Sequence, residues 1–311
     1  MKPESGKTES IWMGTANVPG FESLEVNIEC DVCIVGAGIT GLTTAYMLTC
    51  SGKKVVVVDD GSIGGGESAR TTGHITNVID NRYYNIERLH GEEAAKLAAE
   101  SQTEAIKLLR KIISDNSIDC DLADVNGYLI FKPEESSGVL EKEYEACRRA
   151  GIEVNIAAAP PYKALGDYPC LEFPGQGEFH MLKYLSGLAE ALVSKGGKIY
   201  SQTHIKNITD GSLAIAETKD GYRITAGDIV VATNSPISDY VSIHTKQTAN
   251  RTYVIGINIP KDSVPHALYW DNEDPYHYIR LYKQQKNDVL IIGGEDHKTG
   301  QEDDPEHRFS N

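Results

Sequence analysis

Long apolar runs and a secretion signal are both absent from this sequence. No segment approaches the roughly 18 consecutive apolar residues that a membrane-spanning helix needs. The first thirty residues carry Lys2, Glu4, Lys7 and Glu9 among polar positions, and they lack the basic start and apolar core of a signal peptide. The sequence therefore predicts a soluble, cytoplasmic protein without a membrane span.

The sequence is also short of positive charge. Its 30 lysine and arginine residues face 45 aspartate and glutamate residues, which gives a net charge of −15. A surface of this sign repels phosphate backbones and anionic lipids. We therefore expect no nucleic-acid partner, although the acidic balance equally serves solubility alone.

Cysteine is too sparse and too irregularly spaced for a disulfide framework. Six cysteines are spread over 311 residues, and without an export signal we expect free thiols. Cys30 and Cys33 form a C-x-x-C pair, the spacing of a redox dithiol or of half a zinc site. Residues three apart on a strand point to opposite faces, and redox pairs normally lie at a helix amino terminus. We therefore expect these two thiols to act as small buried hydrophobic groups.

The order of the apolar patterns predicts a βαβ unit, then helices, then mostly strands. An apolar run at 31–38 ends in glycine, a helical pattern follows to Gly52, and a β-branched run covers 53–60. Helices are predicted at 92–116, 134–151 and 181–197. Strands are predicted at 127–132, 198–208, 213–218, 222–233, 251–259, 277–283 and 288–294. The length allows one large or two medium domains.

Three glycines with G-x-G-x-x-G spacing lie between the first predicted strand and the first helix. Gly36 permits a tight turn, Gly38 lets backbone amides approach a pyrophosphate, and Gly41 lets the helix pack close to the strand. The helix amino terminus offers N–H groups and a positive dipole to the phosphates. Asp59 ends the second strand about 20 residues on, where a carboxylate accepts hydrogen bonds from ribose hydroxyls. The pattern predicts a dinucleotide site, which both NAD and FAD would fit.

The segments beyond the glycine turn resemble the D-amino-acid oxidase superfamily of flavoproteins. The loop DDGSIGGGESARTTGHITN at 59–77 is too rich in glycine and small residues for a plain connector. GEFHMLKYLSGLAEALVSKGGKIYSQTHI and DIVVATNSP look like further cofactor-domain segments of that family. ESARTTGH, VIGINIPKDSVPHALYWDNEDPYHYIRL and VLIIGGEDHKTGQ are most similar to a subgroup in which the flavin fold is fused to a carboxy-terminal Rieske 2Fe-2S domain. The resemblance covers residues 10 to 311.

The resemblance implies a two-domain α/β fold, in which an FAD/NAD(P)-binding Rossmann-like domain is interleaved with an antiparallel-sheet substrate domain. It implies an N-terminal arm at 1–29, FAD-binding segments at 30–80 and 171–240, substrate-domain segments at 81–170 and 241–288, and the truncated start of a returning FAD-domain segment at 289–311. The implied cofactor is FAD. The implied cofactor-binding residues are Gly36, Gly38, Ile39, Thr40, Gly41, Asp59, Asp60, Ser68, Arg70, Thr71, Thr72, Ile205, Ala232, Thr233, Asn234 and Gly294.

The resemblance also implies an enzyme, an FAD-dependent oxidoreductase of the amine or amino-acid oxidase or dehydrogenase type. In such enzymes a hydride passes from the substrate carbon to flavin N5, and the protein orients the substrate and tunes the ring. An NAD-dependent dehydrogenase is the alternative that the glycines leave open. The loop at 61–76, which in the family runs along the ribityl chain toward the flavin ring, argues against it.

The Rieske part of that subgroup has no counterpart in this sequence. A Rieske centre needs paired cysteine and histidine ligands, and no cysteine follows Cys170. We expect a truncated chain, with a 2Fe-2S cluster only in the missing C-terminal domain. The alternative function is a non-catalytic flavin-binding or electron-transfer subunit that needs an iron-sulfur partner or that missing part. Expected partners are an amine or amino-acid substrate and an electron acceptor or iron-sulfur domain.

Two side chains of the 59–77 loop are candidates for roles near the flavin. His74 is the candidate catalytic residue, as a proton carrier or a covalent flavin anchor; the alternative is a histidine that only hydrogen-bonds the loop or the cofactor. Arg70 would offset the negative charge of reduced flavin or of the pyrophosphate, or else form a surface ion pair.

Two further groups carry no predicted catalytic or metal role. The tyrosines on the later strands are core residues or substrate contacts, and they are Tyr253, Tyr269, Tyr276 and Tyr278. Glu295, Asp296 and His297 are adjacent in sequence, and contiguous ligands rarely converge on one ion. We therefore expect no metal site.

Overall fold

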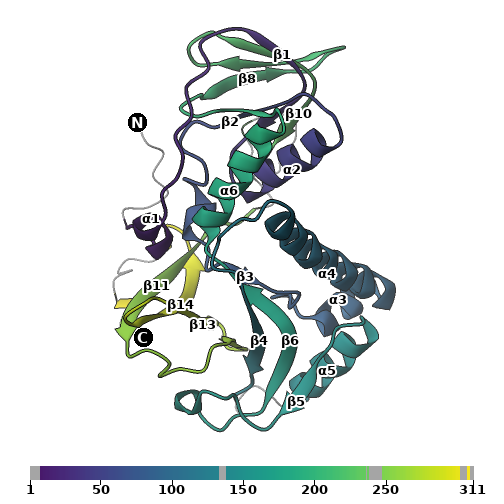
Figure 1. The fold of residues 1–311 in the computed structure, drawn as a ribbon. Helices are drawn as coiled ribbons and strands as arrows, with labels where there is room; N and C mark the ends of the chain where they lie inside the picture. Colours follow the sequence, from purple (N-terminus) through teal and green to yellow (C-terminus); the bar gives the residue numbers. More distant parts are fainter. Residues whose placement is uncertain (1–7, 133–137, 236, 238–246, 302–306, 309–311) are drawn as a thin grey trace. The chain divides into compact units, whose positions relative to one another are not determined.

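The chain folds into two compact units. The computed structural model describes residues 8–132, 138–235, 237, 247–301 and 307–308. Unit 1 comprises residues 1–71, 111–121 and 179–247, and unit 2 comprises residues 72–110, 122–178 and 248–311 (Figure 1). Parts of the predicted segments lie outside the described residues: 1–7 of the arm, 134–137 of a helix, and 241–246, 302–306 and 309–311 of the last two segments.

Unit 1 is built on a six-stranded sheet with the order β7-β2-β1-β10-β9-β8. These strands are β1 (Ile28–Val35), β2 (Val55–Val58), β7 (Lys198–Tyr200), β8 (Ile205–Thr209), β9 (Ala214–Thr218) and β10 (Arg223–Val231). The first four in the order pair in parallel, whereas β10 with β9 and β9 with β8 pair antiparallel. All four valines of β2 are buried, as expected for a central parallel strand.

Two long helices of unit 1 pack against each other, α2 (Ile39–Cys50) and α6 (Met181–Ser194) (Figure 1). The short helix α1 (Ile11–Thr15) belongs to the same unit, and its Trp12 is buried with the indole Nε1 donating to the Thr71 carbonyl at 2.7 Å. The described part of the predicted arm is therefore fixed to the unit by a large aromatic side chain.

Unit 2 contains an eight-stranded sheet with the order β11-β14-β13-β12-β4-β6-β3, to which β5 adds by pairing with β6. The strands are β3 (His74–Ile75), β4 (Ala123–Ile130), β5 (Asn155–Ala157), β6 (Cys170–Glu178), β11 (Asn250–Ile259), β12 (Leu268–Asp271), β13 (His277–Tyr282) and β14 (Asp288–Lys298). The predicted antiparallel sheet is in fact mixed, because β12 pairs with β4 in parallel.

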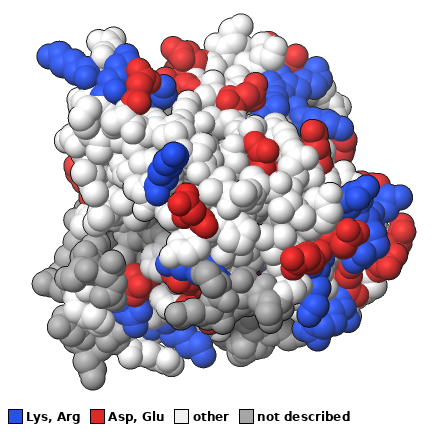
Figure 2. Space-filling model, turned by 90° about the horizontal axis from the view of Figure 1, so that it is seen from below, with Lys and Arg blue, Asp and Glu red and all other residues white. Residues whose placement is uncertain are grey.

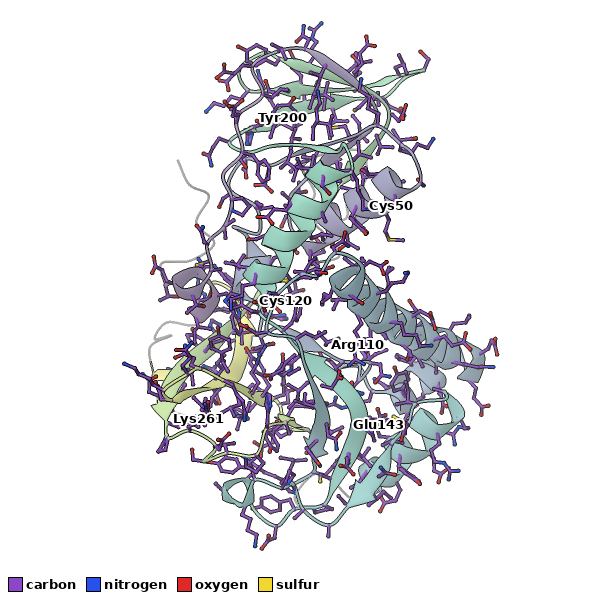
Figure 3. All side chains as sticks on the ribbon, viewed as in Figure 1. Cys50, Arg110, Cys120, Glu143, Tyr200 and Lys261 are labelled. Carbon is purple, nitrogen blue, oxygen red and sulfur yellow. The ribbon has the colours of Figure 1, made fainter. Side chains whose placement is uncertain are left out.

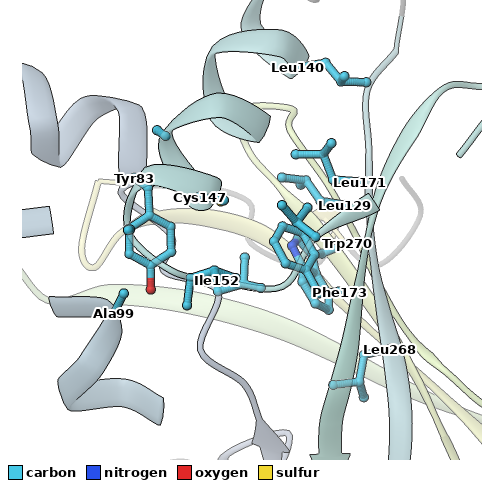
Figure 4. Packing of buried hydrophobic residues seen from close by; sticks show 14 of the residues in the cluster. Tyr83, Ala99, Leu129, Leu140, Cys147, Ile152, Leu171, Phe173, Leu268 and Trp270 are labelled. Carbon is cyan, nitrogen blue, oxygen red and sulfur yellow. The ribbon is translucent and has the colours of Figure 1, made fainter. Parts of the chain in front are cut away.

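Three helices cover one side of the β4 and β6 part of this sheet: α3 (Tyr83–His90), α4 (Glu92–Asp115) and α5 (Val139–Arg149) (Figure 1). The buried core between them includes Tyr83, Leu129, Phe173 and Trp270 (Figure 4). Short 3-10 turns lie at Glu67–Arg70 (η1) and Lys163–Leu165 (η2).

The predicted βαβ unit is confirmed, as are the helices at 92–116 and 181–197 and most strands of the second half. The strand predicted at 198–208 is wrong, because this run forms two strands, β7 and β8, at opposite edges of the sheet. The described part of the 134–151 helix is also present. Helix α3 and strands β3, β5, β6 and β12 were not predicted from the sequence. The reason for β6 is that Pro174, Gly175 and Gly177 interrupt its pattern, and β12 is only four residues long.

The division into units differs from the predicted segments at several points. Strand β14 lies in the unit 2 sheet between β11 and β13, although its residues 289–298 were predicted to start a returning FAD-domain segment. Residues 171–178 form most of β6, in unit 2, although they were predicted to be part of the FAD-binding domain. Backbone pairing decides both positions, and a sequence pattern does not reveal the pairing partner.

Among the described residues, no helix combines the length and the apolar composition needed to cross a bilayer. Figure 2 shows acidic and basic side chains interspersed over the face that it draws. Among the described residues of that face, the negative charge is therefore not gathered into one patch.

Candidate functional site

The glycine turn after β1 is held between the ends of two neighbouring strands. The Gly36 amide donates to the Val58 carbonyl of β2 at 2.8 Å, and the Ala232 amide after β10 donates to the Val35 carbonyl at 2.7 Å. Gly36 has φ of 110°, and a Cβ there would overlap the Ala232 carbonyl oxygen. Only glycine fits this position, because both the backbone angle and the space exclude a side chain.

The other two glycines keep the start of α2 close to this turn. A Cβ on Gly41 would overlap the Gly36 carbonyl oxygen, so its absence lets the helix lie against the strand. Gly38 is the N-cap of α2 with extended backbone, and it supplies no capping side chain. The Ser68 hydroxyl instead accepts from the Ile39 amide at 3.2 Å. Ser68 therefore lies at the positive end of the helix dipole.

Asp59 follows β2 and faces the same turn. Its Oδ2 accepts from the Ala37 amide at 2.6 Å, and its Oδ1 accepts from the Gly61 amide at 2.8 Å. Burial raises the pKa of this carboxyl; the two amide donors oppose the rise and the charge of Asp60 adds to it. Each carboxylate oxygen keeps acceptor capacity beyond its one amide bond. Asp59 is thus fixed beside the glycine turn and able to accept further hydrogen bonds.

These groups fit the adenosine diphosphate part of a dinucleotide. The side-chain-free turn leaves room for a pyrophosphate near the α2 amino terminus, and a carboxylate stands where ribose hydroxyls would need an acceptor. Gly36, Gly38, Ile39, Ser68 and Asp59 are the residues that would hold it.

The remaining predicted cofactor residues of unit 1 have varied surroundings. Thr40 is exposed on α2, and Asp60 is exposed with Oδ2 3.5 Å from Nδ1 of His204. Arg70 donates to the Thr8 carbonyl at 2.7 Å, and the Thr71 carbonyl accepts from Trp12. Both roles expected for Arg70 therefore stay predictions.

The segment after β10 closes around the glycine turn. Ala232 contacts Gly36, the Thr233 hydroxyl donates to the Ser235 carbonyl at 2.6 Å, and Asn234 has φ of 62°. Ile205 begins β8 and is buried in the core of unit 1. The structure therefore brings Ala232 to the turn, whereas Ile205 has a packing role in the described contacts.

In unit 2, His74 lies in β3 among aromatic side chains. Its ring centroid is 6.3 Å from that of Trp270 and 6.0 Å, edge-on, from that of Tyr278. Its Nε2 is buried without a hydrogen-bond partner among the described residues. Burial first, and then the charge of Arg280, lowers the pKa of the imidazole to about 3. His74 is therefore neutral near neutral pH.

Sequence reasoning missed the charged pair next to His74. Arg280 is 1% exposed and Glu178 is 3% exposed, and Arg280 Nε lies 3.2 Å from Glu178 Oε2. Arg280 Nη1 donates to the carbonyls of Thr72 (2.5 Å) and Gly73 (3.2 Å). The one available signal was an arginine inside the apolar strand pattern HYIRLY, where a charge needs a buried partner.

Gly294 is placed differently from its prediction. It lies inside β14, paired with Tyr253 of β11 and His277 of β13, and a Cβ there would overlap the Tyr276 carbonyl oxygen. With φ of 153°, its glycine identity is explained by close strand packing in unit 2.

The adjacent acids and histidine near the end of β14 have separate contacts. Glu295 contacts His277 and Arg308, and His297 contacts the Tyr253 hydroxyl at 2.8 Å. A different group, Asp271 with Glu273 and His277, has possible ligand atoms within 4.8 Å of one another. The carboxylates of this group already have partners within the protein. Glu273 forms an ion pair with Lys132, and His277 lies between the carboxylates of Asp271 and Glu295. We assign no metal to it.

The C-x-x-C pair lies inside strand β1. Burial raises the pKa of Cys33 to about 12 and that of Cys30 to about 11. Both sulfurs are free, and they pack with the buried core of unit 1. Protonated thiols of this kind are poor nucleophiles and metal ligands.

Two curated proteins are similar over most of this chain. A protein named as a Rieske 2Fe-2S iron-sulfur protein, YhfW, from Bacillus subtilis (strain 168) is 32% identical over 294 residues, which is 94% of this chain and 57% of that protein. This chain therefore spans little more than half of that relative. Gamma-glutamylputrescine oxidoreductase from Escherichia coli (strain K12) is 28% identical over 92% of this chain and 70% of its own length.

A solved structure and a family model complete the comparison. Glycine oxidase from Geobacillus kaustophilus has a TM-score of 0.69 at 19% identity, over 88% of this chain and 73% of that one. This likeness confirms the predicted fold class. The model of the FAD dependent oxidoreductase family, DAO, matches residues 31–310. The chain therefore belongs to the DAO family of FAD dependent oxidoreductases.

Proposed function

We propose that this chain holds FAD through the glycine turn of unit 1 and takes part in oxidising an amine or amino-acid-like C–N bond. The observation that carries the proposal is the Asp59 carboxylate fixed on the Ala37 amide, beside a turn in which a Cβ at Gly36 would overlap the Ala232 carbonyl oxygen. The amine is supported by the name of the Escherichia coli relative, gamma-glutamylputrescine oxidoreductase.

The residues divide the work of binding and orientation. Asp59 would accept hydrogen bonds from the ribose, and the amino terminus of α2 with Ser68 would hold the pyrophosphate. Bound FAD would supply the chemistry by accepting a hydride from the carbon next to the substrate nitrogen. Among the expectations for His74, we favour a neutral hydrogen-bonding imidazole over a proton carrier, because a pKa of about 3 makes it a weak base.

The test combines FAD uptake with substrate-dependent reduction. Purified chain is titrated with FAD, and the loaded protein is mixed anaerobically with primary amines, polyamine derivatives and amino acids. We expect saturable FAD binding and loss of the flavin's visible absorbance with at least one amine. Gly41→Ala, which closes the turn, should abolish both signals, whereas Gly14→Ala should preserve them because a Cβ there meets nothing within 4 Å.

A second candidate function, electron transfer with an iron-sulfur component, is supported by a separate observation. The Bacillus relative carries a Rieske name, and this chain matches 57% of that protein. This favours a flavin-binding or electron-transfer role that depends on an iron-sulfur component supplied elsewhere. Flavin reduction by amines with the chain alone would exclude it; reduction only after adding an iron-sulfur protein would support it. An NAD-dependent dehydrogenase would instead shift nicotinamide fluorescence on binding.

A further inference from the structure

Unit 2 contains a fully buried arginine whose charge is not explained by folding alone. Arg280 of β13 lies with Nε 3.2 Å from Glu178 Oε2 of β6, and the other carboxylate oxygen, Oε1, is 2.7 Å from Nε2 of His266. Burying an ion pair such as Arg280 with Glu178 costs desolvation energy, and apolar residues of similar volume often stabilise a fold equally well. The hydrogen bonds of Arg280 indicate a specific structural task for this pair.

The backbone carbonyls that accept hydrogen bonds from Arg280 indicate this task. Its Nη1 donates to the carbonyls of Thr72 and Gly73, the two residues before β3. Strand β3 is only two residues long, and among the described strands it pairs only with β6, at the edge of the sheet. Two ladder positions give little support, so the charge-assisted bonds from Arg280 are a main restraint on this segment.

His74 follows these carbonyls directly. In the ladder it lies opposite Glu178, the residue that pairs with Arg280. Its ring packs against Trp270 and Tyr278, and its Nε2 is buried and unpartnered among the described residues. The groups around the imidazole that carry or can carry charge are Arg280 and Tyr278 of β13 and Glu178 of β6. Burial first, and then the cation of Arg280, opposes protonation of His74 and lowers its pKa, so the histidine is kept neutral.

We propose that Arg280 is a positioning residue: anchored by Glu178, its guanidinium fixes the Thr72 and Gly73 carbonyls and thereby sets the place of the His74 imidazole. The proposal rests on the proposed function, in which the loop ending at His74 serves the oxidation. Arg280 acts through this backbone and through its charge, and it needs no contact of its own with substrate or cofactor.

Two substitutions separate the effect of the Arg280 charge from the effect of its hydrogen bonds. Arg280→Met keeps an unbranched side chain but removes the charge and the donors. Arg280→Lys keeps the charge, but one ammonium group does not reproduce the planar donor arrangement of the guanidinium. The full chain is labelled at histidine for NMR and titrated with acid, with the His74 signal assigned from its loss in His74→Asn. Amide hydrogen exchange at residues 73–75 is measured in parallel.

Arg110 provides a matched control within unit 2. Its Nη2 donates to the carbonyls of Gly175 and Gln176 and pairs with Asp124 at 2.7 Å, which is the same combination of two carbonyls and one carboxylate. Figure 3 shows it on α4. Arg110→Met therefore loses the same kinds of bond without touching Thr72 or Gly73.

The expected results distinguish positioning from general stability. In Arg280→Met the pKa of His74 should rise from about 3 toward the ordinary histidine range, and exchange at 73–75 should be roughly tenfold faster. In Arg280→Lys only the exchange should change, and Arg110→Met should alter neither quantity. Unchanged exchange at 73–75 in both Arg280 variants would overturn the proposal; if Arg280→Met does not fold, Arg280→Lys alone decides.

Steady-state kinetics test whether the position of His74 affects the proposed oxidation. In FAD-loaded protein, Arg280→Met, His74→Asn and the double variant should lower kcat by similar factors with little change in KM, because the two residues act in one pathway. Losses that multiply in the double variant would contradict positioning through His74. If no variant and no wild-type protein oxidises an amine, the proposed function fails, while the NMR and exchange results still decide the role of Arg280.

Discussion

The carboxylate of Asp59 and the amide of Ala37 are joined by a hydrogen bond of 2.6 Å. This bond ties the end of β2 to the glycine turn after β1, and a second bond from the Gly61 amide fixes the other oxygen. The carboxylate is therefore oriented before any ligand arrives. Such preorganisation reduces the entropy cost of binding.

Removing the charge of Asp59 should weaken FAD binding. In Asp59→Asn the new amide group would face an N–H donor of Ala37 or Gly61, and the ribose loses a charged acceptor. A charge-assisted hydrogen bond contributes about 1.5–3 kcal/mol, so FAD affinity should fall by roughly tenfold to a hundredfold. Flavin fluorescence titration measures this loss. Asp220→Asn, at an exposed position, should bind as the wild type does.

The same carboxyl should make FAD binding depend on pH. Burial raises the pKa of Asp59, so the group becomes protonated at a higher pH than an ordinary aspartate. The ionised form is the better acceptor for ribose hydroxyls. FAD affinity should therefore be full above the raised pKa and decline as the pH falls through it. If the dissociation constant for FAD changes with pH in the same way in the wild type and in Asp59→Asn, the pH dependence belongs to another group.

Gly41→Ala should destabilise unit 1 and close the turn. The added Cβ would overlap the Gly36 carbonyl oxygen, which is backbone and has no rotamer with which to move away. Overpacking of this kind costs about 1–3 kcal/mol. A lower denaturation midpoint together with lost FAD binding is expected. Equal midpoints for Gly41→Ala and Gly14→Ala would show that the helix does not depend on this close approach.

His277 should stabilise unit 2 only while it is charged. Its Nδ1 is 2.9 Å from Asp271 Oδ2 and its Nε2 is 3.3 Å from Glu295 Oε1, and only the imidazolium donates from both nitrogens. Burial opposes the charge, but the bonds and charges of Asp271 and Glu295 outweigh it and raise the pKa. The stabilisation is complete below the unfolded-state pKa of about 6.5 and is lost as the pH rises through the raised folded-state pKa.

Thermal unfolding across this pH range measures the effect. The melting temperature of His277→Gln should lie below that of the wild type in mildly acidic solution, and the two should converge as the pH rises. Lys132 and Glu273 stay paired in both proteins, so Lys132→Met tests whether their ion pair contributes separately. A constant difference between wild type and His277→Gln at every pH would mean that packing, not charge, is responsible.

The proposed dinucleotide site could be predicted because its determinants are local in sequence. Gly36, Gly38 and Gly41 lie within six residues, and Asp59 follows the next strand, so one βαβ unit sets all their positions. The glycine roles assigned from spacing agree with the Cβ overlaps found at Gly36 and Gly41. The cysteine pair was also understood from its place inside a strand, and its raised pKa values agree with that interpretation.

Residues whose partners are distant in sequence were not predictable. Glu143 has the pattern of a polar helix position, yet it is fully buried on α5 and accepts from the Tyr83 and Tyr84 amides at the start of α3 (Figure 3). The Arg280 and Glu178 pair joins strands that are about a hundred residues apart and not adjacent in the sheet. Hydrophobic periodicity predicts which face of a helix or strand is buried, but it does not predict which charged residue from another element will pair with a side chain on that face.

We propose that this chain uses FAD to take electrons from an amine. The most direct test of this proposal is an anaerobic titration of the FAD-loaded chain with amines and amino acids, followed by the flavin's visible absorbance. We predict stoichiometric bleaching by an amine and recovery of the absorbance when an electron acceptor is added. Saturable FAD binding without bleaching by any amine, with or without an iron-sulfur partner, would contradict the account.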